Sequence, residues 1–268
     1  MSLRLTILGC GSSGGVPRLS DDPGGEWGAC DPADPLNRRT RCSLLVERPG
    51  PEGTTRVLVD TSPDMRAQLL AAGIGRLDGI VWTHGHADHT NGIDDVRMIV
   101  FNARQRIRGW AHPPTARILR ERFGYVFEQA PGSAYPAICD LSVFEDPFAV
   151  PGPGGPIPFA PFEVAHGGMP TLGLRIGPAA YVPDAVEIPE ASWPHLSGLD
   201  LLVVDALRRR PHPTHAHLGR TLEWIARAAP RRAVLTNMHV DLDRATVDAE
   251  TPAHVTPAHD GMTLSVEL

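Results

Sequence analysis

Four residues with metal-binding side chains stand within six positions of one another, namely His84, His86, Asp88 and His89. They follow the apolar run 79–83, which predicts a buried strand, and the turn after such a strand can aim alternating side chains at one point. Imidazole nitrogens and carboxylate oxygens are the usual ligands of zinc, manganese and iron. We expect His84 and His86 to share one face and reach a first metal ion, and Asp88 and His89 to reach a second one nearby. A histidine-rich surface loop is the alternative interpretation.

Three further residues of ligand type stand where largely apolar runs end. His166, Asp184 and His239 each follow a run that predicts a strand. Taken singly, such a residue is more often a turn residue or a helix cap. Together with the cluster at 84–89, the three would complete a two-metal site, since a metal ion with only two protein ligands is weakly held.

Short strands and a few helices, separated by glycine and proline, must position these residues. The expected strands cover residues 3–8, 41–47, 56–60, 79–83, 162–165, 171–176, 180–182, 201–205, 233–236 and 262–267, and the expected helices cover 63–72, 95–106, 115–123 and 218–228. The first helix should bury Met65, Leu69 and Leu70 and stop at Gly73. We expect the proline-rich stretch 147–161 to be a connector without regular structure. The pattern favours one α/β domain over residues 1–268, with a division at that connector as the alternative.

The composition excludes several classes of protein. The 268 residues carry 25 basic and 31 acidic side chains, a formal net charge of −6, and every basic residue is arginine. A long nucleic acid is therefore a poor partner, because its binding needs a cationic face. No apolar run reaches the roughly 20 residues that cross a bilayer, and the N-terminal residues resemble a strand and a glycine turn rather than a signal peptide. The four cysteines are scattered, which favours a reduced, cytoplasmic protein over a disulfide scaffold.

The order of these residues resembles the pattern of the metallo-β-lactamase superfamily of hydrolases. That pattern is an aspartate, then His-x-His-x-Asp-His, then a histidine, an aspartate and a histidine at later strand ends. The matching residues here are Asp60, His84, His86, Asp88, His89, His166, Asp184 and His239. The resemblance implies a four-layer αβ/βα sandwich with the metal site at one edge of its two sheets.

Within this superfamily the chain is similar to the branch of cyclic-phosphate phosphodiesterases known from phosphonate breakdown. The shared features are the glycine-rich opening 8–17, the strand start 41–43, the segment 91–97 after the cluster, and a histidine in the loop 212–218 before a late helix.

Two departures from this branch affect the expected sites. Some relatives carry a cysteine-rich structural zinc site after the glycine turn, but only Cys30 is present there, so we predict no structural zinc. The last ligand histidine of the family often stands in a Leu-Thr-His sequence, where this chain has Asn237. His239 is two residues later and would face the same way on a strand, so we assign it as the ligand.

The predicted chemistry uses two divalent metal ions about 3.5–4 Å apart that share a bridging hydroxide as nucleophile. Asp184 is suited to bridge them, since each carboxylate oxygen can bind one ion. Asp60 should orient a ligand histidine or the nucleophile by a hydrogen bond, and with His215 and Asp88 it makes up the predicted catalytic residues. His215 is the expected general acid because it matches the relatives' loop histidine and imidazole titrates in the right range. His212 and His217 are the competing candidates, or all three are exposed loop residues with His217 capping the helix.

Arginine is the residue expected to hold a phosphate, because its planar fork matches phosphate oxygens. Arg97 lies just past the cluster and is predicted, with His217, to contact the substrate. Pairing of Arg97 with Asp94 or Asp95 is the alternative.

The resulting hypothesis is a metal-dependent phosphodiesterase that cleaves a small cyclic sugar phosphate or nucleotide. The expected cofactors are two divalent metal ions, zinc or manganese, although such ligands also accept iron or nickel. The expected partner is a small phosphorylated substrate rather than a long nucleic acid or a membrane, and a homodimer is compatible with the chain. The alternatives are hydrolysis of a thioester or lactone on the same dinuclear site, or a non-catalytic biosynthetic accessory protein on this fold.

Overall fold

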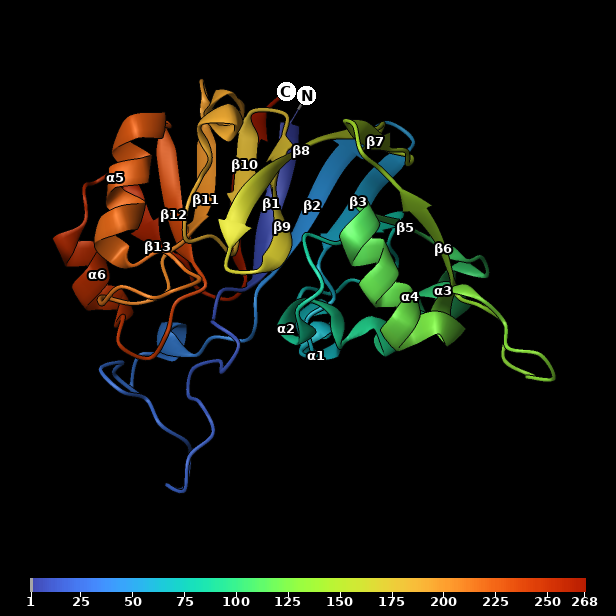
Figure 1. Ribbon diagram of the computed structural model, residues 1–268, viewed down its shortest axis with the longest axis horizontal. Coiled ribbons are helices and arrows are strands. Elements are labelled where there is room, and N and C mark those ends of the chain that lie inside the picture. Colours follow the sequence, from blue (N-terminus) through green and yellow to red (C-terminus); the bar gives the residue numbers. More distant parts are fainter. Residues whose placement is uncertain (1) are drawn as a thin grey trace.

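Two mixed β-sheets lie face to face and are flanked by helices on both outer sides (Figure 1). The computed structural model describes residues 2–268. The first sheet has the order β14-β1-β2-β3-β4-β5-β6, and the second has the order β13-β12-β11-β10-β9-β8-β7. This arrangement confirms the predicted four-layer αβ/βα sandwich.

The strands of the first sheet are β1 Ser2–Gly9, β2 Ser43–Gly50, β3 Gly53–Val59, β4 Gly79–Val81, β5 Ile107–Ala111, β6 Cys139–Val143 and β14 Met262–Glu267. Those of the second are β7 Phe148–Val150, β8 Ile157–His166, β9 Met169–Ile176, β10 Ala179–Val182, β11 Leu201–Asp205, β12 Arg232–Thr236 and β13 Val255–Pro257. The helices are α1 Met65–Ala71, α2 Ala87–Thr90, α3 Val96–Ala103, α4 Pro113–Phe127, α5 Leu218–Ala228 and α6 Arg244–Glu250, with 3-10 turns η1 Pro35–Asn37, η2 Ile93–Asp95 and η3 Glu190–Leu196.

Each sheet contains a parallel part whose strands all end at one edge. In the first sheet β3 to β6 are parallel, and in the second β10 to β13 are parallel. Side chains that follow the carboxyl ends of parallel strands gather at that edge. The predicted ligands that follow β3, β4 and β10 are therefore brought to one end of the sandwich.

Two apolar clusters hold the layers together. One lies between the sheets and includes Leu5, Val59 and Val203, and it continues to Trp224 on α5. The other joins the outer face of the first sheet to α1, α3 and α4 through side chains such as Leu119. Strands that run between two covered faces are apolar on both sides, which explains the uninterrupted apolar runs of β4 and β11.

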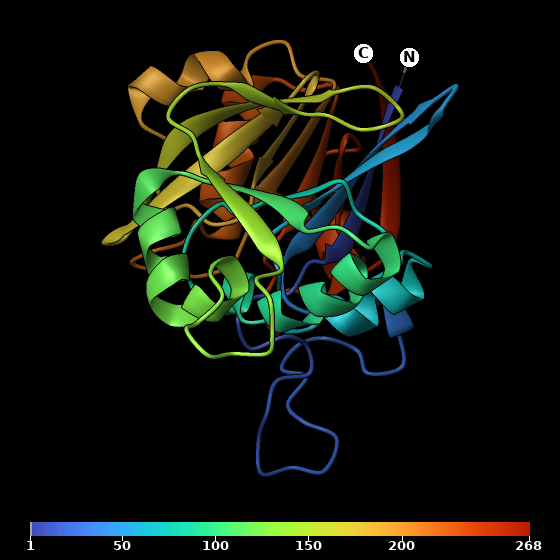
Figure 2. The same cartoon turned by 90° about the vertical axis from the view of Figure 1, so that its right-hand side faces the viewer.

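The long connection between β1 and β2 extends from the same end of the sandwich as α2 (Figures 1 and 2). Its base is anchored by Arg39, which is buried and donates hydrogen bonds to the backbone oxygens of Leu242, at 2.7 Å, and His239, at 3.3 Å. Gly11 also forms an isolated bridge with Met238. The connection is thus tied to the chain after β12, next to the predicted last ligand.

The structure corrects two expectations about elements. The stretch 147–161 is not an irregular connector, because it contains β7 and the start of β8, which pair with each other. The prolines inside these strands are Pro158 and Pro161 of β8, whose residues 157–159 pair with β7 and whose residues 160–166 pair with β9. Each proline therefore has a paired strand on one side only, as at a sheet edge, where its missing N–H is tolerated. Leu70 is not part of the buried face of α1, since it is 66% exposed, whereas Met65 and Leu69 are buried as predicted. In residues 2–268, no helix is long and apolar enough to cross a membrane.

Candidate metal centre

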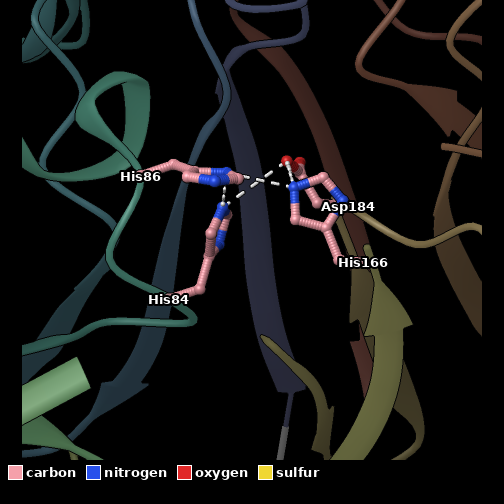
Figure 3. A group of neighbouring side chains, drawn as sticks. All are labelled: His84, His86, His166 and Asp184. Atoms are coloured by element: carbon pink, nitrogen blue, oxygen red, sulfur yellow. Dashed lines mark hydrogen bonds and ion pairs between the residues drawn. The ribbon is translucent and has the colours of Figure 1, made fainter. Parts of the chain in front are cut away.

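Four side chains converge at the edge where the parallel strands end. They are His84, His86, His166 and Asp184, and their candidate ligand atoms all lie within 4.8 Å of one another (Figure 3). Nδ1 of His86 is 3.1 Å from Nε2 of His84 and 3.0 Å from Nε2 of His166. Oδ2 of Asp184 is 3.6 Å from Nε2 of His84 and 3.4 Å from Nε2 of His166. Three imidazole nitrogens and one carboxylate oxygen thus face a common point.

The sequence places these four side chains at the ends of three strands. His84 follows β4 by three residues, and His86 is the N-cap residue of the short helix α2. His166 is the last residue of β8, and Asp184 follows β10 by two residues. Gly85 allows the turn between the two histidines to pack against α4, since a Cβ at this position would lie 2.7 Å from Cδ1 of Ile118.

The protonation of two ring nitrogens is set by neighbours that face away from the cluster. Nδ1 of His166 is 2.7 Å from the backbone oxygen of Thr214, which can only accept, so Nδ1 carries the proton. Nδ1 of His84 is 3.0 Å from Oγ1 of Thr83, which itself donates to Asp60. Each ring therefore presents the lone pair of Nε2 to the cluster, as a metal-binding histidine must.

A second candidate position lies beside the first, around His89. Its Nδ1 is 2.7 Å from Oδ2 of Asp60, which leaves Nε2 as the free nitrogen. Nε2 is buried and has no hydrogen-bond partner among residues 2–268. Its neighbours are Oδ1 of Asp184 at 3.3 Å and Oδ2 of Asp88 at 3.8 Å. A buried, unpaired nitrogen between two carboxylates fits a second cation, with Asp184 offering one oxygen to each position.

The electrostatics of the cluster favour a bound cation. Burial lowers the pKa values of His84, His86 and His166 and so keeps these imidazoles neutral, the form that can bind a metal ion. Burial also opposes a charge on His89, but the carboxylates of Asp184 and Asp60 outweigh it and raise the pKa of His89 well above its usual value. The centre therefore attracts positive charge, which a divalent ion would supply.

Asp60 is held in an unusual backbone conformation that aims its carboxylate at this position. Its φ is 64°, in the left-handed region that aspartate tolerates better than most residues. Its two oxygens accept hydrogen bonds from the backbone N–H and the hydroxyl of Thr83, both at 2.8 Å. The carboxylate thereby orients both His89 and the residue before His84.

A hydrogen-bonded group lies next to the cluster and includes His215, Asp205 and Asn237. The ring of His215 contacts that of His166 edge-on, with 4.5 Å between centroids. Its Nδ1 is 2.9 Å from Oδ2 of Asp205, the buried last residue of β11. Burial lowers the pKa of His215, but the hydrogen bond and charge of Asp205 outweigh this effect and raise the pKa above its usual value. Burial raises the pKa of Asp205 to about 7.

The strand geometry on which the assignment of His239 depended is not present in the structure. The strand β12 ends at Thr236, and Asn237 has a φ of 59°, so the period of two does not continue. Nε2 of His239 is instead 3.0 Å from Nη1 of Arg18. The amide of Asn237 lies beside Asp184, with Nδ2 3.3 Å from Oδ1.

The other predicted residues have partners of their own. His217 is the N-cap residue of α5, where its Nδ1 accepts from the backbone N–H of Arg220 at 3.3 Å. Arg97 is 3.6 Å from Asp94 and lies over the ring of Tyr135. Nδ1 of His212 accepts from the backbone N–H of Thr214 at 3.3 Å, and its ring centroid is 5.2 Å from that of His215.

Three residues that support the site were not identified from the sequence, namely Asp205, Thr83 and Arg122. Asp205 could have been found, because it ends a buried apolar run as Asp184 nearly does. Thr83 precedes the cluster but gives no signal of its own. Arg122, on α4, donates to the backbone oxygen of Gly85 at 2.7 Å, a contact between segments distant in the chain that no local pattern indicates.

Comparison with known proteins shows which family the chain is similar to. Residues 55–238 match the family described as Beta-lactamase superfamily domain. A solved diphosphatase from the PhnP family has a TM-score of 0.87 and 37% identity, and the match covers 100% of this chain and 98% of that one. The Zn²⁺-bound PqqB of Methylobacterium extorquens has a TM-score of 0.73 and 22% identity, with 99% and 100% covered.

A curated relative carries a different name. The chain is 31% identical to a protein of Porphyromonas gingivalis (strain ATCC BAA-308 / W83) called octanoyltransferase, over 97% of this chain. The match covers 51% of that protein, so the chain spans about half of its length.

Proposed function

The chain belongs to the β-lactamase superfamily, and from this membership and the geometry above we propose that it is a metal-dependent phosphodiesterase acting on a small cyclic sugar phosphate or nucleotide. The observation that carries the proposal is His215, an imidazole outside the ligand set whose ring touches His166 and whose Nδ1 is held by Asp205. A phosphodiester expels an alkoxide, which needs a proton in the transition state. A thioester expels a thiolate, which leaves without a proton, so its hydrolysis makes less use of a fixed acid. A lactone expels an alkoxide as a phosphodiester does, so the substrate panel must separate these two classes.

Six residues take part in the proposed two-metal centre, and Asp184 belongs to both positions. The first ion would be held by His84, His86, His166 and Asp184, and the second by Asp88, His89 and Asp184, with His239 no longer assigned. When bound, such ions supply Lewis acidity and a water of lowered pKa.

The residues around the centre would orient it and move one proton. Asp60 fixes the ring of His89, and Thr214 fixes that of His166, so that neither has to reorganise during the reaction. Asp205 holds Nδ1 of His215, which leaves Nε2 as the atom that donates to the leaving oxygen. Nε2 of His215 makes no hydrogen bond within residues 2–268.

The diphosphatase and the octanoyltransferase differ in the substrate class that their names indicate. The diphosphatase at 37% identity acts on a phosphorylated compound by its name, which favours a small phosphate substrate here and makes a diphosphate the second candidate. The octanoyltransferase name favours acyl chemistry, but this chain covers only 51% of that protein.

A substrate panel tests the proposal. Metal-loaded protein would be assayed on a cyclic sugar phosphodiester, a cyclic nucleotide, a diphosphate, a thioester and a lactone under one set of conditions. We expect the highest kcat/KM on a phosphodiester. A higher kcat/KM on the diphosphate would show that the enzyme cleaves a phosphoanhydride bond instead of a phosphodiester bond. A higher kcat/KM on the thioester or the lactone would refute the proposal.

A further inference from the structure

We propose that the two cation positions of this centre are unequal, with a tight first site and a second site weakened because Asn237 presents an amide N–H where the family pattern has a ligand histidine. The inference rests on the proposed metal-dependent function and concerns only how the ions are held. It makes Asn237 a positioning residue for the centre.

The surroundings of Asn237 fix which end of its amide faces the centre. Nδ2 is 3.3 Å from Oδ1 of Asp184 and 3.2 Å from Oδ1 of Asp205, and it is also 3.0 Å from Nδ1 of His215. The two carboxylate oxygens accept hydrogen bonds, so the NH₂ group must point toward them. An amide nitrogen has no available lone pair, and Asn237 therefore cannot bind a cation through the atom that faces it.

The backbone makes this arrangement stable. Asn237 is 2% exposed and has a φ of 59°, a conformation that asparagine adopts more readily than most residues. Its amide bridges Asp184, at the proposed metal centre, to Asp205, which holds the proposed acid. The residue thus links the two halves of the site rather than completing the second ligand set.

The hydrogen bond from Asn237 to Asp184 should lower the affinity of this carboxylate for the second ion and leave its affinity for the first unchanged. Oδ2 of Asp184 faces His84 and His166, at the first position, while Oδ1 faces His89 and the amide of Asn237. A donor on Oδ1 takes up part of the negative charge that the second ion would use. The first position keeps three imidazoles, and the second keeps one.

Within residues 2–268, His239 does not compensate for this loss. His239 follows Asn237 by two residues, but its Nε2 is bonded to Arg18 and its Nδ1 lies 3.4 Å from Oδ1 of Asp241. The second position therefore depends on one imidazole and two carboxylates, a set rich in oxygen that suits manganese better than zinc.

Metal binding measured without substrate tests the inference. Metal-free protein would be titrated with Zn²⁺ and with Mn²⁺ by calorimetry, and the retained metal would be counted by mass spectrometry after exposure to a chelator. We expect two steps whose dissociation constants differ by at least about tenfold, with one ion retained.

Two variants locate the cause. Asn237→His restores the family ligand, and histidine also tolerates a left-handed backbone, so the second step should tighten and two ions should be retained. His239→Ala is the matched control, and both steps should be unchanged in it.

The outcomes separate the inference from the proposed function. Two equally tight ions in the unaltered protein, or a loss of one ion in His239→Ala, would overturn the inference and leave metal-dependent hydrolysis standing. No binding at all would overturn both. Circular dichroism would show whether Asn237→His folds. If it does not, the isotherm of the unaltered protein still decides the question, because unequal sites give one strong and one weak binding step and equal sites give two steps of the same affinity.

Discussion

Replacement of His215 by alanine should slow the hydrolysis of phosphodiesters in proportion to how much their leaving group needs a proton. The ring is held at 2.9 Å by Asp205, and its pKa is raised, so an imidazolium is available near neutral pH. A positioned general acid contributes about 10²–10⁴-fold, or about 2.7–5.5 kcal/mol. The side chain is 16% exposed, and water can enter the space that the ring leaves. We therefore expect a loss in the lower part of this range, about 10²–10³-fold, for an alkoxide leaving group.

The assay compares two substrates that share a phosphoryl group. One releases an alkoxide, and the other releases nitrophenolate, which is stable without a proton. In His215→Ala, kcat should fall by the full factor on the first substrate and by only a few fold on the second. His212→Ala, in the same loop, is the control and should retain both rates.

The reasoning would be refuted by an equal loss on both substrates, which would indicate a structural role for His215, or by no loss on the alkoxide substrate. Metal content should be counted in each variant, because a lost ion would reduce both rates.

Three further predictions concern the support of the centre and of the fold. Asp205→Asn removes the charge that raises the pKa of His215, so the alkaline decline of kcat, where the acid loses its proton, should move to lower pH, and an unmoved pH profile would exclude this role. Asp60→Asn leaves His89 without its carboxylate and should weaken metal binding by about 10–100-fold in calorimetry. Asp243→Ala removes the N-cap of α6 and should lower the free energy of unfolding by about 1 kcal/mol at neutral pH in urea titrations. Burial raises the pKa of Asp243, but hydrogen bonds from Thr246, Asn37 and Asp31 outweigh it and lower the pKa. This contribution is therefore complete above about pH 4 and is lost as the pH falls through the folded pKa, and a difference that persists in acid would contradict the argument.

The first metal position could be predicted almost entirely from the sequence. His84, His86 and Asp184 follow the carboxyl ends of parallel strands, which brings them to one edge. His166 ends β8, which runs in the same direction as β10 because both strands pair antiparallel with β9, so it reaches the same edge. The four-layer sandwich could be predicted from the family resemblance, because the pattern of short strands and helices alone indicates only an α/β domain.

The second position could not be predicted in the same way. The assignment of His239 assumed that β12 continues, but the left-handed backbone of Asn237 ends the alternation, and a single sequence does not reveal this turn. The hydrogen bond between Asp205 and His215 depends on a distance between two segments, which residue types do not specify. The strands in 147–161 could not be predicted because proline usually ends strands, whereas Pro158 and Pro161 lie in parts of β8 that pair with a neighbouring strand on one side only.

The most direct test of the account is the metal dependence of phosphodiester hydrolysis. Protein loaded with zinc or manganese, with its metal content verified, would be assayed on a cyclic phosphodiester before and after removal of the metal by a chelator, and again after metal is restored. The account predicts turnover that disappears with the metal and returns with it. Metal-loaded protein that turns over no phosphodiester, or turnover that the chelator leaves unchanged, would contradict it.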